Sequence, residues 1–341
     1  MKYCARCILP ESYPGIVFDE EGVCNYCLEY EPDRQAIGKT ELLELVAGKE
    51  RTGPYDCIVP MSGGKDSTYI LYYIVKELGL RPLAVSYNSG YQHEIAATNV
   101  RTACEVLNVP LEEVCSPGEI QSRLLNAGYV LSKKLGRIWG CANCAAILRV
   151  LPVLAANRHK VPFVFYGDSR LEAVANKKSE TAAGGGIRSK LLKMGKMVAK
   201  DPSLAYHASR YIYWRMRQRL VLGFPFSLVV KPFAVPEFSD ENPTFIHFYD
   251  YVSWDSIKNV GLLETEVGWK HPVGRDTRFD CTLECISNLW YLKDYGISHV
   301  GVNLCNVLRE GRMSREEALT REEEVKRTAQ AEYDELIRKV G

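Results

Sequence analysis

Residues 60–68 form the stretch that most constrains how this chain can fold. They read Pro-Met-Ser-Gly-Gly-Lys-Asp-Ser-Thr, and they join a short apolar run at residues 56–59 to an unbroken, apolar-rich helical pattern at residues 69–78. The run at 56–59 follows a Gly-Pro turn signal and is typical of a β-strand. The stretch is therefore predicted to be the loop of a strand–loop–helix unit, from which α/β folds are built.

This loop has the composition of a phosphate-binding loop. Gly63 and Gly64 can adopt backbone angles closed to other residues and let main-chain N–H groups approach an anion. The positive end of the following helix attracts the same anion, and Lys65 adds a mobile charge. The loop also carries three hydroxyl donors: Ser62, Ser67 and Thr68. The G-x-x-x-x-G-K-S/T loop is excluded, because here the glycines are adjacent and Asp66 follows the lysine.

Residues 62–67, Ser-Gly-Gly-Lys-Asp-Ser, resemble the SGGxDS signature of the PP-loop, or N-type ATP pyrophosphatase, superfamily. The resemblance implies an α/β fold with a doubly wound, mostly parallel sheet of the HUP-like kind. It also implies that ATP is cleaved between its α and β phosphates, a carbonyl or carboxyl oxygen is adenylated, and ammonia or sulfur displaces AMP. On this resemblance the ATP phosphates are bound by Ser62, Gly63, Gly64, Lys65, Asp66 and Ser67. Lys65, directed to phosphate oxygens, and Asp66, directed to Mg²⁺, are the expected catalytic residues.

Length and composition are those of an ordinary globular protein. The 341 residues exceed the usual size of one core, which favours a large α/β domain with one or two small attachments. There are 43 Lys and Arg against 42 Asp and Glu, so charge alone does not indicate non-specific nucleic-acid binding. No signal peptide or long apolar run is present. We therefore expect a cytoplasmic protein without a membrane partner.

Four cysteines near the N-terminus have the spacing of a zinc site. Cys4 and Cys7 form one C-x2-C pair and Cys24 and Cys27 form a second, with sixteen residues between the two pairs. This pattern predicts a zinc ribbon at residues 1–32, in which four thiolates hold one tetrahedral zinc ion. A zinc ion with four protein ligands has no open position, so we expect a role in folding or docking.

Strand and helix patterns alternate beyond the loop, as in a parallel sheet covered on both faces. We predict an ATP-binding α/β core at residues 50–180 and a substrate-binding and helical C-terminal region at 181–341 that completes the active site. Ligands of such sheets lie at the carboxyl ends of the strands. Ser86 and Gly167 lie toward the carboxyl ends of two predicted strands, at residues 81–87 and 163–168, and are therefore expected to contact the nucleotide.

Three further cysteines are candidates for chemistry. Cys141 and Cys144 open a predicted helix, where thiolates have lowered pKa values, and Cys281 follows a segment dense in charge and glycine. Together the three could ligate a [4Fe–4S] cluster with one open iron, and Cys144 and Cys281 could act as catalytic thiols. The alternative is that Cys141 and Cys144 form a structural pair and that Cys281 is buried.

The stretch at residues 190–219 is basic and helical, with aromatic residues interleaved among its arginines. One interpretation is a face for a nucleotide, a sugar nucleotide or an RNA phosphate. The favoured interpretation is a solvated amphipathic helix that packs its aromatic side chains inward. Farther on, Ser314-x-x-Glu317 is a capping box that predicts the start of a charged final helix.

Both ends of the chain also resemble the N-acetyl sugar amidotransferases of bacterial surface-glycan synthesis. The similar segments are residues 6–10, 14–25 and 309–318. The resemblance implies ATP-dependent conversion of an acetamido group on a nucleotide-activated sugar to an acetamidino group, with ammonia from a separate glutaminase. The Cys141–Cys144 pair with Arg149 instead resembles iron–sulfur-dependent tRNA thiolation enzymes. That resemblance implies a sulfurtransferase acting on a tRNA base or small molecule, served by a sulfur-donor protein.

Overall fold

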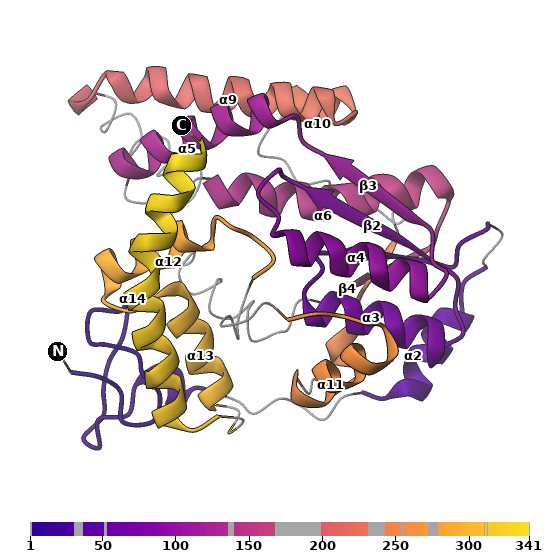
Figure 1. Ribbon diagram of the computed structural model, residues 1–341, viewed down its shortest axis with the longest axis horizontal. Coiled ribbons are helices and arrows are strands. Elements are labelled where there is room, and N and C mark those ends of the chain that lie inside the picture. Colours follow the sequence, from indigo (N-terminus) through magenta and orange to yellow (C-terminus); the bar gives the residue numbers. More distant parts are fainter. Residues whose placement is uncertain are drawn as a thin grey trace. The chain divides into compact units, whose positions relative to one another are not determined.

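In the computed structural model the described residues are 2–30, 37–50, 53–135, 140–167, 199–230, 243–253, 256–271, 279–309, 311 and 313–340. The chain divides into two compact units (Figure 1). The described part of one unit comes from Ile37–Gly167 and Gly185–Gly274 and contains the sheet. That of the other comes from Met1–Ala36 and Arg275–Gly341. The predicted division at residues 32, 50 and 180 stays a prediction.

Five parallel strands form the sheet of the larger unit, in the order β3-β2-β1-β4-β5. The strands are β1 (Cys57–Met61), β2 (Pro82–Asn88), β3 (Leu111–Cys115), β4 (Phe163–Tyr166) and β5 (Thr244–His247). The chain runs outward from β1 to β3 and then returns to the other side of β1 for β4 and β5. This order is that of a doubly wound sheet, which confirms the predicted fold class.

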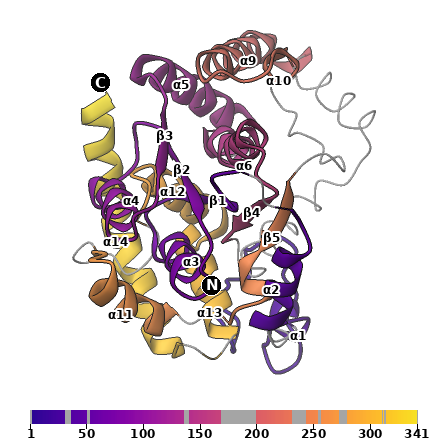
Figure 2. The same cartoon turned by 90° about the vertical axis from the view of Figure 1, so that its right-hand side faces the viewer.

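Helices cover both faces of the sheet (Figure 2). The helices α3 (Lys65–Lys76) and α4 (Glu94–Val106) lie on one face, and α6 (Gly140–His159) lies on the other. Alternate residues of β2 explain this arrangement, since Leu83, Val85 and Tyr87 pack with the apolar side of α6. Because both faces are covered, β1, β2 and β4 are apolar almost throughout, whereas the edge strand β3 carries two glutamates.

The basic helix α9 (Ser203–Val221) differs from the favoured interpretation. It packs on α5 (Gly118–Leu135) through Tyr211, but Tyr206 and Tyr213 are 60% and 50% exposed. Arg215 and Arg219 are buried instead. Of the aromatic residues on which the expectation rests, Tyr211 and Trp214 pack inward against α5, and the expectation is wrong for Tyr213.

Buried hydrogen bonds explain the orientation of α9. Gln218 donates to the Tyr87 hydroxyl at 3.1 Å, and Arg219 donates to the Leu228 carbonyl of α10 (Phe226–Val230) at 2.7 Å. Burial and, to a smaller extent, the charge of Arg215 lower the pKa of Arg219 to about 10. These bonds fix one side of the helix inward, so Tyr206 and Tyr213 lie on the other side.

Three shorter elements complete the larger unit. They are α2 (Lys39–Ala47), α11 (Ser256–Glu266) and the 3₁₀ helix η1 (Phe248–Asp250). Helix α11 packs against α3, and η1 follows β5 directly.

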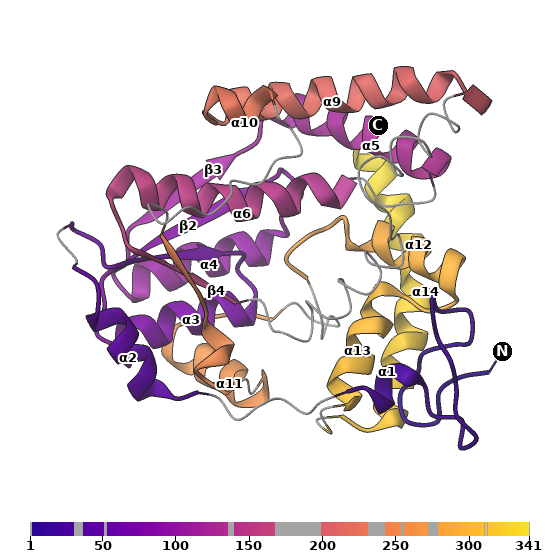
Figure 3. The ribbon, with the colours of Figure 1, turned by 180° about the vertical axis from the view of Figure 1, so that it is seen from behind.

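The smaller unit joins the two ends of the chain in one core (Figure 3). Its helices are α1 (Asn25–Leu28), α12 (Glu284–Tyr295), α13 (His299–Arg309) and α14 (Arg315–Val340). The four N-terminal cysteines pack with Val300, Leu304 and Cys305 of α13. Two isolated antiparallel bridges, Tyr3↔Pro10 and Phe18↔Cys24, shape the N-terminal segment.

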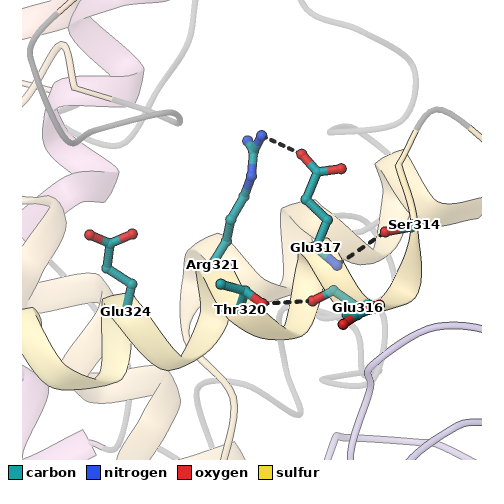
Figure 4. Close-up of a pocket in the computed structure, with 6 residues that line it drawn as sticks. All are labelled: Ser314, Glu316, Glu317, Thr320, Arg321 and Glu324. Atoms are coloured by element: carbon teal, nitrogen blue, oxygen red, sulfur yellow. Dashed lines mark hydrogen bonds and ion pairs between the residues drawn. The ribbon is translucent and has the colours of Figure 1, made fainter.

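The final helix begins as the capping box predicts. The Ser314 hydroxyl accepts a hydrogen bond from the Glu317 N–H at 3.1 Å. A surface pocket here is lined by Ser314, Glu316, Glu317, Thr320, Arg321 and Glu324 (Figure 4). Ordinary helix contacts satisfy much of this lining, including a Glu317–Arg321 ion pair at 2.6 Å. Among the described residues, no helix is long and apolar enough to cross a membrane.

Candidate functional site

The predicted phosphate loop lies between the end of β1 at Met61 and the start of α3 at Lys65. Hydroxyl groups hold it closed, since Ser62 Oγ lies 3.3 Å from Ser67 Oγ and accepts from the Gly64 N–H at 3.2 Å. Ser67 Oγ in turn donates to the Gly64 carbonyl at 3.2 Å. The N-cap residue of α3 is Gly64, so no side chain caps this helix. A helix start with that property is suited to an anion.

Position 63 requires glycine for two reasons, its backbone conformation and the lack of room for a side chain. Its φ is +86°, a region that favours glycine. A Cβ at this position would lie 2.0 Å from the carbonyl oxygen of Ala96 in α4. The backbones of the loop and α4 therefore touch where no side chain fits.

Two residues that the prediction did not include bind the Gly63 carbonyl. Asn99 donates to it through Nδ2 at 3.2 Å, and Trp269 donates through Nε1 at 3.0 Å. Asn99 also binds the carbonyl and the N–H of Lys270, each at 2.9 Å. Both side chains are almost fully buried. A buried asparagine on the apolar side of α4 could have indicated this role, whereas the Trp269 contact has no local signal.

Lys65 and Asp66 form an ion pair in the first turn of α3. Lys65 Nζ lies 2.9 Å from Asp66 Oδ2, and each side chain is 32% exposed. The Tyr249 hydroxyl lies 3.5 Å from Asp66 Oδ1, and Gln92 donates to the Ser62 carbonyl at 3.0 Å. A cation and a carboxylate are thus both presented beside the uncapped helix start.

The loop lies where the strand order reverses. β1 pairs with β4 at Ile58↔Val164, and Pro60 has no N–H to continue that ladder. Gly167 directly follows β4, and a Cβ on it would lie 2.8 Å from Ile70 of α3. In doubly wound sheets, ligands bind at the carboxyl ends of the strands beside such a reversal.

Ser86 lies inside β2 and not at its end, because the strand continues to Asn88. It pairs with Met61 and is fully buried, and its hydroxyl has no hydrogen-bond partner among the described residues. Its predicted nucleotide contact stays a prediction. The strand end itself is formed by Asn88, whose Oδ1 accepts from the Gly90 N–H at 2.8 Å.

Cys144 borders a buried polar cluster at the ends of β2 and β3. Gln121 Nε2 lies 3.8 Å from its Sγ, and Gln218 donates to Ser116 Oγ at 2.7 Å. The Tyr87 hydroxyl lies 2.8 Å from the same Ser116 oxygen. Burial raises the pKa of Tyr87, and the nearby Cys144 raises it further. Gln218 comes from α9, so spacing around Cys144 could not predict it.

The structure does not test the proposed three-cysteine cluster. Cys144 belongs to the larger unit and Cys281 to the smaller one, and both are partly exposed. The Cys141 side chain lies outside the described part of the structure. The predicted [4Fe–4S] ligation therefore stays a prediction.

The four N-terminal cysteines do come together. The Sγ atoms of Cys4 and Cys27 are 3.9 Å apart, those of Cys7 and Cys24 are 3.8 Å apart, and all four lie within 4.8 Å of one another. Hydrogen bonds from Cys24 and Cys7 lower the pKa of the Cys27 thiol, and Arg309 lowers it further. The cluster could hold one metal ion.

Comparisons with known proteins give distant likenesses. No family model matches the chain. An uncharacterised protein of Methanocaldococcus jannaschii is 28% identical over 113 residues, which span 32% of this chain and 40% of that protein.

Two solved structures resemble the whole fold weakly. The U34-tRNA thiolase NcsA from Methanococcus maripaludis with its [4Fe–4S] cluster is 12% identical, over 97% of this chain and 89% of its own, with a TM-score of 0.39. NMN synthetase from Francisella tularensis is 11% identical, over 80% and 91%, with a TM-score of 0.31. Scores this low assign neither a family nor a function, so function is argued from the site.

Proposed function

We propose that this chain is an ATP-dependent amidotransferase that forms pyrophosphate and AMP. Its acceptor is the N-acetyl group of a nucleotide-activated sugar, whose carbonyl oxygen is replaced by nitrogen. One observation carries the proposal: the closed loop at residues 62–67 joins β1 to an uncapped helix start, beside the point where the strand order reverses.

The loop supplies groups suited to a triphosphate. Main-chain N–H groups and the positive end of α3 attract the β and γ phosphates, and Lys65 neutralises charge on their oxygens. Asp66 would hold Mg²⁺, because that ion is bound through one or two carboxylates together with substrate phosphates. The Asp66 carboxylate is partly exposed beside the helix start, which fits this role.

The chemistry balances in two steps. The acetamido oxygen attacks the α phosphorus of ATP, the bond between that phosphorus and the bridging oxygen breaks, and pyrophosphate leaves. Ammonia then attacks the activated carbon, and the original oxygen leaves with AMP. Adenylation thus turns a poor leaving group into a phosphate that the loop can stabilise. A separate glutaminase would supply the ammonia.

A second candidate function is sulfur transfer to a tRNA base or a small molecule. Cys144 favours it, since this thiol borders a polar cluster at the strand ends. The activation step would be the same, and a sulfur-donor protein would replace the glutaminase. A [4Fe–4S] cluster would need Cys141, Cys144 and Cys281 as ligands.

We also propose zinc for the four-cysteine cluster. A zinc–sulfur distance of about 2.3 Å places tetrahedral ligands roughly 3.8 Å apart. The Sγ atoms of Cys7 and Cys24 are 3.8 Å apart, and those of Cys4 and Cys27 are 3.9 Å apart. The spacing does not suit a four-iron cluster, because each of its cysteines ligates a different iron. The buried, closed site supports a structural role.

Product analysis tests the main proposal. The full chain is incubated with ATP, Mg²⁺, ¹⁵N-labelled ammonium and a panel of nucleotide-linked N-acetyl sugars. We expect pyrophosphate, AMP and a ¹⁵N-labelled amidine. Production of only ADP and orthophosphate with an accepted sugar would refute it.

A matched pair of variants tests the role of the loop. Asp66→Asn should lower kcat/KM by about 100-fold or more, the usual cost of losing a charge-stabilising group. Glu94→Gln alters the equivalent acidic first turn of α4 and should leave activity unchanged. Equal losses in both would contradict the assignment.

Iron and sulfide analysis after anaerobic purification decides between nitrogen and sulfur. A colourless protein that makes the amidine, and still does so as Cys144→Ala, supports amidotransfer. A brown protein with about four irons per chain, lost on replacement of Cys141, Cys144 or Cys281, supports sulfur transfer instead.

A further inference from the structure

A half-buried arginine, Arg309, binds the sulfur atoms of the four-cysteine cluster. Arg309 Nε donates to Cys27 Sγ at 3.3 Å, and its Nη2 donates to Cys7 Sγ at 3.7 Å. Its Nη1 donates to Asn306 Oδ1 at 2.7 Å, which holds the guanidinium in place. The side chain therefore presents two N–H groups to two different sulfurs.

Two other arginines reach the same segment in a different way. Arg6 donates to the Cys27 carbonyl at 3.2 Å, and Arg315 donates to the carbonyls of Cys7 and Cys4 at 3.3 and 3.4 Å. Both bind main-chain oxygens and not sulfurs. Of these three arginines, Arg309 is thus the one that binds the sulfurs.

The charge of a loaded site explains why such a contact is needed. Four thiolates around a divalent ion carry a net charge of −2, and all four cysteines are buried in a largely apolar core. Burying an uncompensated charge is unfavourable, and hydrogen bonds to a charged group are the strong ones. A guanidinium offers a fixed fork of donors that can serve two sulfurs at once.

We propose that Arg309 is the counter-ion of the metal centre, which stabilises bound metal through its hydrogen bonds to Cys7 and Cys27. The inference rests on the metal proposed above. Arg309 ends α13, and Cys305, one turn earlier, also lies beside the Cys7 thiol. Metal in the N-terminal cluster therefore secures α13, and through it the core of the smaller unit.

Metal release from the full-length protein tests this role. Zinc-loaded wild type, Arg309→Met, Arg309→Lys and Arg315→Met are mixed with a chromophoric zinc chelator, and the transfer of zinc is followed. Arg309→Met should bind zinc about 10- to 100-fold more weakly, as when other groups that support metal ligands are removed. Arg309→Lys keeps the charge without the fork and should fall between. Arg315→Met loses only carbonyl contacts and should resemble wild type.

Cobalt spectra give a readout of the sulfur atoms themselves. Loss of an N–H donor raises the energy of the sulfur lone pairs, so the thiolate-to-cobalt band of Arg309→Met should shift to longer wavelength. Arg315→Met should keep the wild-type band. If Arg309→Met does not fold, Arg309→Lys takes its place in the test. A cobalt band and a zinc affinity of Arg309→Lys that both equal those of the wild type would overturn the inference.

The outcomes separate this inference from the zinc proposal. A wild-type chain that binds neither zinc nor cobalt refutes the metal site itself. A wild-type chain that binds metal, with unchanged affinity and spectrum in Arg309→Met, refutes only the role of Arg309.

Discussion

Replacing Gly63 by alanine tests the central contact of the phosphate loop. The new Cβ would lie 2.0 Å from the Ala96 carbonyl oxygen and 2.6 Å from its carbon, so backbone atoms of α4 would have to move. The residue would also have to keep a φ of +86°. Two separate penalties therefore act at one position.

The magnitude follows from these two penalties. A left-handed conformation costs a non-glycine residue roughly 1–2 kcal/mol, and overpacking adds about 1–3 kcal/mol. We expect Gly63→Ala to lower the free energy of unfolding by roughly 2–5 kcal/mol, or to distort the loop so that ATP binding is lost. Two glycines serve as controls. Gly79 has a φ of +64° with nothing within 4 Å, and Gly64 has an ordinary φ with only Ser62 Oγ near, at 3.3 Å.

Urea unfolding followed by circular dichroism measures the stability, and calorimetry measures ATP binding. Gly79→Ala should show only the cost of conformation, and Gly64→Ala should be the mildest for stability. The excess cost of Gly63→Ala over Gly79→Ala reports the contact with α4. If Gly63→Ala and Gly79→Ala are equally stable and bind ATP equally well, the reasoning about the loop is refuted.

Three further predictions concern buried groups. Asn99→Ala removes the bonds to Gly63 and Lys270 and should lower the free energy of unfolding by about 2–4 kcal/mol, measured in urea, because buried partners are left unsatisfied; a change within error would contradict this. Burial raises the pKa of Glu322 although Ser298 hydrogen bonds lower it, so the folded state binds this proton more tightly than the unfolded state. Its contribution to stability should be complete below about pH 4.3 and lost as pH rises through the folded pKa, and unfolding at several pH values should show this slope in wild type and not in Glu322→Gln. Cys27→Ser should lose the metal in elemental analysis, whereas Cys305→Ser should keep one metal per chain, because Cys305 is not among the four clustered ligands; metal loss in both would make Cys305 a ligand.

Local sequence patterns were sufficient for the elements around the loop. The apolar run before residue 60 is β1, and the pattern after residue 64 is α3. Strand period, helix period and glycine conformation depend on neighbouring residues, so they can be read along the chain. The spacing of Cys4, Cys7, Cys24 and Cys27 likewise predicted a cluster that the structure brings together.

Helix α9 shows where local patterns fail. Its composition allowed either the aromatic or the basic residues to face inward, and no local pattern indicated hydrogen-bond partners for the basic ones. The structure buries Arg215, Gln218 and Arg219. Gln218 donates hydrogen bonds to Tyr87 and Ser116, and Arg219 donates one to the Leu228 carbonyl. A polar side chain is stable inside a protein when its partners are there, and only the fold supplies them.

The sequence by itself determined the α/β architecture, the position of the phosphate loop and the four-cysteine cluster, since short-range spacing encodes each of them. Tertiary structure alone decided which distant groups complete them. Trp269 reaches Gly63 across 206 positions, and Arg309 reaches Cys27 across 282. Such contacts form only after the helices and strands pack together. Residues far apart in sequence can then lie side by side, and no local sequence pattern indicates which of them will meet.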